Sequence, residues 1–213
     1  VRRLSDRDVW DRAWTELMRQ PLLEAPTVIP TPDTLKTLCA GDNGKAFEVP
    51  DDCPDRQVGG SARGEKLLTS FLDRRCVGYQ YNISSPNTAV RACSRLSPHI
   101  AYGTVSLREV YQEAKAAGNH RNTLPRKKKS LTSFRSRLHW HCHFIQKLED
   151  EPELEFRAMH REMEALKSGP NDSERLQRWQ DCQTGRPLVA ASMRPLAPSG
   201  SPNLPPPPLP CRR

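Results

Sequence analysis

Long hydrophobic runs are absent from this 213-residue sequence, which never approaches the roughly 18 consecutive apolar residues that a membrane-spanning helix needs. No apolar signal segment stands near its N-terminus. The seven cysteines form no Cys-x-x-Cys pair and no regular spacing, which argues against a disulfide framework and against a zinc module. We therefore expect reduced thiols, no resident metal, no membrane partner and a cytoplasmic location.

The sequence also lacks sustained alternation of apolar and polar residues, the pattern that is typical of half-buried strands. Its apolar residues recur instead at helical spacing, so we predict an all-α fold. The predicted helices cover residues 5–19, 61–76, 106–118, 130–149, 173–184 and 187–194. Between the first two, residues 20–60 hold six prolines and little periodicity, which predicts an extended connector.

The sequence is clearly basic, with a formal net charge of +8 and an isoelectric point near 9.3. A polyanion is then a plausible partner, although a generically basic protein fits the same numbers. Residues 126–130, with the sequence RKKKS, are predicted to form a solvated basic loop, with contact to a phosphate backbone as the alternative.

The predicted helix over 130–149 is apolar on two sides. One seam comprises Leu131, Phe134, Leu138, Cys142 and Ile145, and a second face carries Arg137, Trp140, His141 and Phe144. The second face must therefore meet another helix or a ligand. His139 and His143 lie one turn apart and suggest a metal site, but the sequence fixes no third ligand for it.

Residues 93–97, with the sequence CSRLS, combine short hydroxyls with one arginine immediately before Pro98. Hydroxyls and an arginine donate hydrogen bonds to phosphate oxygens, and a helix start adds backbone N–H groups. The same residues also fit an ordinary helix start, with Ser97 as the N-cap and Pro98 in the first turn. Taken alone, this run leaves both interpretations open.

Several segments together resemble the flavin-binding helical domain of the DNA photolyase and cryptochrome family. In family order they are GGSARGEKLLTSFL at 59–72, Tyr79, SRLSPHIAYGTVSLREV at 94–110, the tryptophan helix at 137–148 and WQDCQTGRPLVAASMR at 179–194. The resemblance implies an all-α, incomplete FAD-binding domain at 59–200. It also divides the chain into an interdomain helix at 1–20, an extended connector at 21–58 and a disordered proline-rich tail at 201–213.

The resemblance carries functional residues with it. It implies FAD as the cofactor, bound by Tyr79, Cys93, Ser94, Arg95, Leu96, Ser97, Phe134 and His141. It implies DNA with pyrimidine dimers as the partner, contacted by Trp140 and Arg137, since an aromatic plane suits an unstacked base. It assigns no catalytic side chain, because the flavin supplies the redox chemistry.

Four positions depart from the family pattern. Arg137 replaces a glutamate that contacts the dimer in relatives, and Cys93 replaces a threonine with a better hydrogen-bonding side chain. Ala190 and Arg186 replace an aspartate and a tyrosine near the end of the match. The loss of the glutamate weakens the case for repair of the dimer.

The match stops near Gly200, and six of the thirteen residues that follow are proline. Such a segment does not continue a helical domain. We expect a truncated or frameshifted product, with a natural splice or lineage tail as the alternative. On this interpretation the chain binds flavin weakly or not at all and is inactive as it stands. Phe134, Trp140, Phe144 and the segment 188–193 are then more exposed than core residues of their type.

Three functions remain open from sequence. The first is a fragment of a light-driven, FAD-dependent photolyase, in which reduced flavin passes an electron to the dimer and regains it after the bonds split. The second is a cryptochrome-like photoreceptor with the same cofactor and no repair, which Arg137 favours. The third is a non-enzymatic basic fragment, or a product without function.

Overall fold

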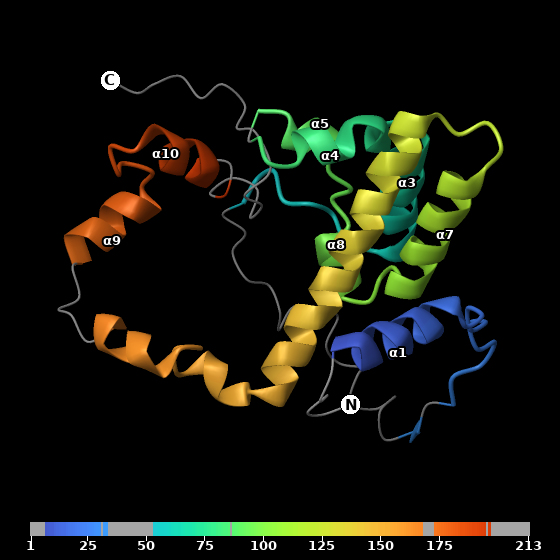
Figure 1. Ribbon diagram of the computed structural model, residues 1–213, viewed down its shortest axis with the longest axis horizontal. Helices are drawn as coiled ribbons and strands as arrows, with labels where there is room; N and C mark the ends of the chain where they lie inside the picture. The colour runs from blue at the N-terminus through green and yellow to red at the C-terminus, as the bar shows by residue number, and fades with distance from the viewer. Residues whose placement is uncertain are drawn as a thin grey trace.

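The computed structural model of the protein describes residues 7–30, 32–33, 53–85, 87–167, 173–194 and 196. All regular secondary structure in these residues is helical, and they contain no strand, so the all-α prediction is confirmed (Figure 1). Within the same part of the chain, no helix is both long enough and apolar enough to cross a membrane. The first two residues of the helix predicted at 5–19 and the predicted tail at 201–213 lie outside the described residues.

The main body is a cluster of helices around one apolar core. Its long members are α3 (Ser61–Asp73), α7 (Leu107–Asn119) and α8 (Pro125–Asp150), which lie side by side in Figure 1. The short members are η2 (Arg75–Gly78), α4 (Tyr79–Asn82), α5 (Ala89–Ala92) and α6 (Ser97–Ala101). The buried core residues are Leu68, Phe71, Leu72, Cys76, Tyr79, Leu96, Val105, Val110, Ala114, Leu131, Phe134 and Leu138.

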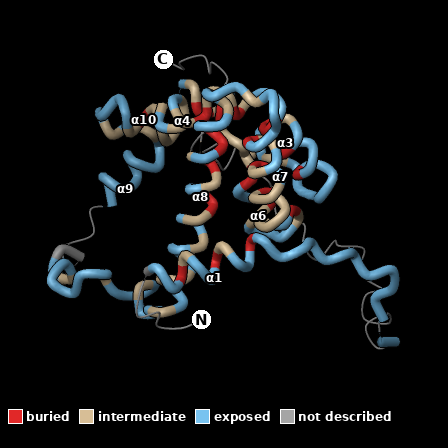
Figure 2. The backbone as a smooth tube through the Cα atoms, turned by 45° about the vertical axis from the view of Figure 1, so that its right-hand side comes forward, coloured by how far each residue is buried: buried red, intermediate tan, exposed pale blue. Residues whose placement is uncertain are grey.

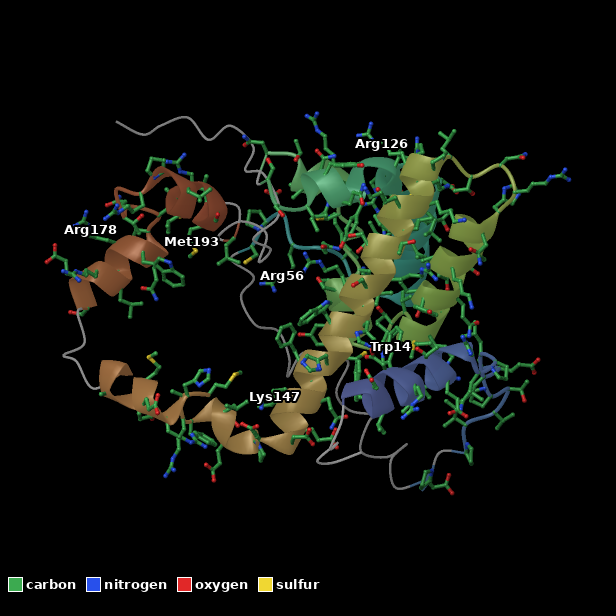
Figure 3. All side chains as sticks on the ribbon, in the orientation of Figure 1. Trp14, Arg56, Arg126, Lys147, Arg178 and Met193 are labelled. Carbon is green, nitrogen blue, oxygen red and sulfur yellow. The ribbon has the colours of Figure 1, made fainter. Side chains whose placement is uncertain are left out.

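The start of α8 corrects one prediction. The basic run that we expected in a loop lies in the first turns of α8, which begins at Pro125. Proline suits the first helical position because its fixed φ is already helical and its missing N–H has no partner there. The helix is then continued by a hydrogen bond from the Lys128 N–H to the Leu124 carbonyl, 3.0 Å long. Figure 3 labels Arg126 at this end of α8.

Burial along α8 explains how the helix serves two environments. Leu131, Phe134 and Leu138 are buried against the core, as their spacing predicts. Further along, Cys142 is half-buried and Ile145 is exposed, so the seam ends at about the middle of the helix. The second half of α8 therefore extends beyond the apolar core, and Figure 2 draws it mostly in the colours of intermediate and exposed residues.

The first helix, α1 (Arg7–Arg19), packs across α7 and α8 (Figure 1). Trp10, Trp14 and Met18 form its buried stripe, whereas Leu17 is exposed. The end of α1 is fastened by Gln112, whose amide donates to the carbonyls of Met18 and Gln20 at 2.9 and 2.8 Å.

After α8 the chain leaves the cluster. It forms η3 (Pro152–Glu155), η4 (Arg161–Lys167), α9 (Ser173–Gln180) and α10 (Pro187–Met193). In Figures 1 and 2 these elements curve away from the main body and are mostly exposed. Helix α10 begins at Pro187 as predicted and ends at Met193, one residue before its predicted end, and α9 ends at Gln180, before the predicted stop at residue 184. Gly185 has a φ of +69° and belongs to the turn between the two helices.

Candidate functional site

The loop at residues 93–96 joins α5 to α6 and lies beside η2. Leu96 anchors it, because this side chain is 1% exposed and belongs to the apolar core. Arg95 adopts a φ of +62°, which costs free energy for a residue with a side chain and is uncommon for residues other than glycine. From outside the loop, the Gln57 side-chain amide donates to the Arg95 carbonyl at 3.0 Å.

Arg75 is the principal support of this loop, and sequence reasoning missed it. Its guanidinium donates to the carbonyls of Cys93 and Ser94, the second at 3.2 Å. The same group donates to the carbonyl of Leu67 at 2.8 Å and to the hydroxyl of Ser70 at 3.2 Å, both on α3. A single side chain therefore holds the loop against α3.

The loop region carries positive charge without an opposite charge beside it. Among the described residues, no carboxylate forms an ion pair with Arg75 or Arg95. Burial, with a further contribution from the charge of Arg95, lowers the pKa of Arg75 below its ordinary value. The Nε atom of Arg95 is buried and has no hydrogen-bond partner in the described part of the chain. An anion would give the Arg95 Nε atom a partner and would offset the charge of both arginines.

Two further groups in this region are neutral. Burial raises the pKa of the Cys93 thiol, so the loop carries no thiolate to repel an anion at neutral pH. Burial also raises the pKa of Tyr79 to about 12, so its phenol stays protonated and can donate a hydrogen bond. The charge balance of the loop therefore suits a phosphate-bearing ligand, and the residues present fit the phosphates of FAD.

Tyr79 and Phe134 form part of one aromatic cluster. The ring of Phe134 lies 4.6 Å from that of Phe71 and 5.5 Å from that of Tyr79, measured between centroids. Phe134 is only 3% exposed, so our expectation that it would be more exposed than a core residue is wrong. It is buried because the rings of α3 and α4 cover it within the cluster itself.

The predicted DNA-contacting residues lie on the open side of α8. Trp140 is 43% exposed and Phe144 is 61% exposed, as expected, and Arg137 and His141 are also exposed. The charge of Arg137 acts on the Tyr79 phenol, which places this arginine near the aromatic cluster. No hydrogen bond, ion pair or ring contact between described residues joins Trp140 or His141 to the loop at 93–96.

Trp140 lines a small cavity of about 90 Å³ between α1 and α8, together with Trp10, Asp11, His139 and His143. His139, which the sequence suggested as a metal ligand, instead contacts α1. Its Nε2 lies 2.7 Å from Oδ1 of Asp11, and its ring packs edge-on against Trp10. In the part of the chain that the structure describes, no group of three or more His, Cys, Asp or Glu side chains could hold a metal ion.

A larger cavity of about 480 Å³ also lies between α1 and α8. Its walls are mostly apolar side chains of α1, among them Trp10, Trp14 and Leu17, with Cys142 and Ile145 from α8. None of the residues that we predicted to bind the cofactor or DNA lines it. The candidate site is therefore defined by hydrogen bonding and charge at the loop, and not by the volume of a cavity.

Comparison with known proteins shows which family the chain resembles. Residues 134–203 match the family model described as the FAD binding domain of DNA photolyase. A deoxyribodipyrimidine photo-lyase of Streptomyces griseus is 31% identical over 183 residues, which cover 83% of this chain and 37% of the relative. A second, of Halobacterium salinarum, is 31% identical over 140 residues, or 64% of this chain and 28% of the relative.

A solved structure gives the same result in three dimensions. The crystal structure of a bacterial class III photolyase from Agrobacterium tumefaciens superposes with a TM-score of 0.63 at 26% identity. The match covers 84% of this chain and 35% of the other. The chain thus spans about a third of the length of the relatives that it matches.

Proposed function

Since the chain belongs to the DNA photolyase family, we propose that it is part of a light-driven, FAD-dependent enzyme that acts on DNA containing pyrimidine dimers. The observation that best supports this proposal is the loop at 93–96, where two arginines without carboxylate partners lie beside a neutral thiol. The named relatives are photo-lyases and lend no support to the photoreceptor or the non-enzymatic alternative.

In this proposal the residues at 93–97 and Tyr79 bind the phosphates of FAD. The guanidinium of Arg95 and the hydroxyls of Ser94 and Ser97 donate hydrogen bonds to phosphate oxygens. Leu96 fixes the loop to the core, and Phe134 supports the Tyr79 ring from within that core. His141, on the exposed side of α8, would contact the flavin ring. When bound, reduced FAD supplies light-driven electron donation to the dimer.

Trp140 and Arg137 form the DNA-contacting surface in this proposal. An exposed indole offers a flat apolar surface on which an unstacked base can lie. Arg137 adds a positive charge on the same side of α8, one turn before Trp140. The basic residues 126–129 lie at the far end of the helix and contribute general attraction to the phosphate backbone.

Removal of the Ser97 hydroxyl tests the phosphate assignment. We expect Ser97→Ala to weaken FAD binding by about 1 kcal/mol, or roughly fivefold in the dissociation constant, because one hydrogen bond to phosphate is lost. Cys93→Thr should keep or improve the affinity, since a hydroxyl is a better donor than a thiol. The measurement is an FAD titration followed by amide chemical shifts, which also detects weak binding.

Ser136→Ala, at an exposed hydroxyl on α8, is the matched control and should leave the FAD affinity unchanged. Equal affinities of the Ser97→Ala variant, the control and the unaltered protein would remove Ser97 from the site.

Replacement of Trp140 tests the DNA assignment. We expect Trp140→Ala to reduce the preference for dimer-bearing over undamaged DNA by about 1 kcal/mol, because the stacking surface is lost. Competition binding at two salt concentrations measures this preference separately from general affinity. Trp179→Ala is the control, because Trp179 on α9 is 44% exposed and thus as accessible as Trp140. If both variants changed the preference alike, Trp140 would have no specific role.

A further inference from the structure

Arg75 makes an unusual set of contacts for a charged side chain. Its four acceptors, three backbone carbonyls and the Ser70 hydroxyl, are all neutral. Two of the carbonyls belong to the loop, at Cys93 and Ser94, eighteen and nineteen residues away in sequence. The planar guanidinium has five N–H donors in a fixed fork, so it can bond both segments at once.

These contacts determine which polar groups the loop presents. A carbonyl oxygen that faces an anion repels it, and the two loop carbonyls at Cys93 and Ser94 are instead directed toward Arg75. The loop is thereby held in the conformation in which Arg95 has a positive φ and a buried, unpartnered Nε. Without Arg75, nothing else among the described residues bonds to the Cys93 carbonyl.

The contacts also leave the charge of Arg75 without compensation. The acceptors supply only partial charges, and no described carboxylate pairs with this side chain. Burial lowers the pKa of Arg75, and the nearby charge of Arg95 lowers it further. The charged form of Arg75 is therefore less favourable beside Arg95 than it would be alone. Two arginines placed in this way repel each other until an anion arrives between or beside them.

We propose that Arg75 is a positioning residue that shapes the 93–96 loop for phosphate and gives the site its preference for a diphosphate-bearing ligand. This inference rests on the proposed function, because it takes FAD as the ligand of the loop. Arg75 touches the loop from the protein side and acts on the phosphates through the loop conformation and through its charge.

The test compares three variants of the full chain. Arg75→Gln removes the charge and most donors, Arg75→Lys keeps the charge without the fork, and Arg74→Gln removes the neighbouring arginine, whose side chain is exposed. Each is titrated with FAD, with ADP as a probe of the diphosphate, and with adenosine as the same nucleoside without phosphate. Circular dichroism and thermal melting establish that each variant is folded at the temperature of the titration.

We expect Arg75→Gln to weaken the binding of FAD and of ADP by about tenfold or more. Arg74→Gln should change either affinity by less than about twofold, because an exposed charge is screened. The affinities of Arg75→Lys for FAD and ADP should lie between those of the other two variants. Adenosine should bind equally to all variants. In the unliganded protein, the backbone amides at 94–96 should exchange hydrogen faster in Arg75→Gln than in Arg74→Gln. A merely structural role would instead weaken adenosine and ADP by the same factor.

Two results would overturn the inference alone. They are equal FAD affinity in Arg75→Gln and the unaltered protein, and equal losses for ADP and adenosine. If the unaltered protein bound neither FAD nor ADP, the proposed function would fail and the inference with it, so the two failures are distinguishable.

Discussion

Phe134→Ala is expected to lower the free energy of unfolding by about 3–5 kcal/mol. The side chain is 3% exposed, and its ring contacts those of Phe71 and Tyr79. Truncation removes this apolar surface, leaves a cavity between α3 and α8 and deletes two aromatic pairs. Chemical denaturation of the variant and of the unaltered protein measures the loss of unfolding free energy, provided that both show the same dependence of that free energy on denaturant concentration.

The matched control is Phe144→Ala, ten residues further along the same helix. Phe144 is 61% exposed, so its truncation should cost less than about 1 kcal/mol. If the two variants were equally stable, Phe134 would not be a core residue. It would then be available to line the flavin site directly, as the family resemblance implies.

Gly64→Ala should destabilise the protein by about 3 kcal/mol, although alanine is normally the better helix former. A Cβ atom at Gly64 would lie 2.2 Å from Cγ2 of Val105 and 3.0 Å from Nδ1 of His99. Val105 and His99 are both buried, and a β-branched valine has little rotamer freedom with which to move away. The overlap must therefore shift α3 relative to the segment that follows α6.

Gly118→Ala on α7 is the control for this experiment. A Cβ there would meet only Leu131 atoms at 3.8 Å, which is ordinary contact. This substitution should be neutral or stabilise the protein by up to about 1 kcal/mol, because it lowers the entropy of the unfolded chain. Thermal unfolding of both variants gives the comparison. A stabilised Gly64→Ala variant would show that α3 does not approach residues 99–105 this closely.

Local sequence signals predicted the helices well where the pattern was long. Helix α7 covers Leu107–Asn119, within one residue of the predicted range 106–118 at each end, and the Ser106 side chain makes no cap hydrogen bond. Helix α8 was recognised from its apolar seam, but its start was placed five residues late. The basic run obscured the helix, whereas Pro125 was a usable signal for its first turn.

The resemblance located the candidate loop, but the sequence did not reveal what holds it. Arg75 acts through carbonyls that are distant in sequence, and backbone acceptors have no residue-type signature. The burial of Phe134 was missed for a similar reason, because it depends on rings contributed by α3 and α4. Both features are tertiary, and periodicity within one helix carries no information about them.

The central claim is that residues 93–97, supported by Arg75, form an FAD phosphate site in part of a photolyase. The most direct test is to titrate the unaltered protein with FAD and with ADP into the millimolar range and to follow every assigned backbone amide. We predict saturable shifts that centre on residues 93–97 and Tyr79 and are alike for both ligands, whereas bound adenosine should leave the amides of residues 93–97 unshifted. The absence of shifts, or shifts that centre on the larger, apolar cavity between α1 and α8, would contradict the claim.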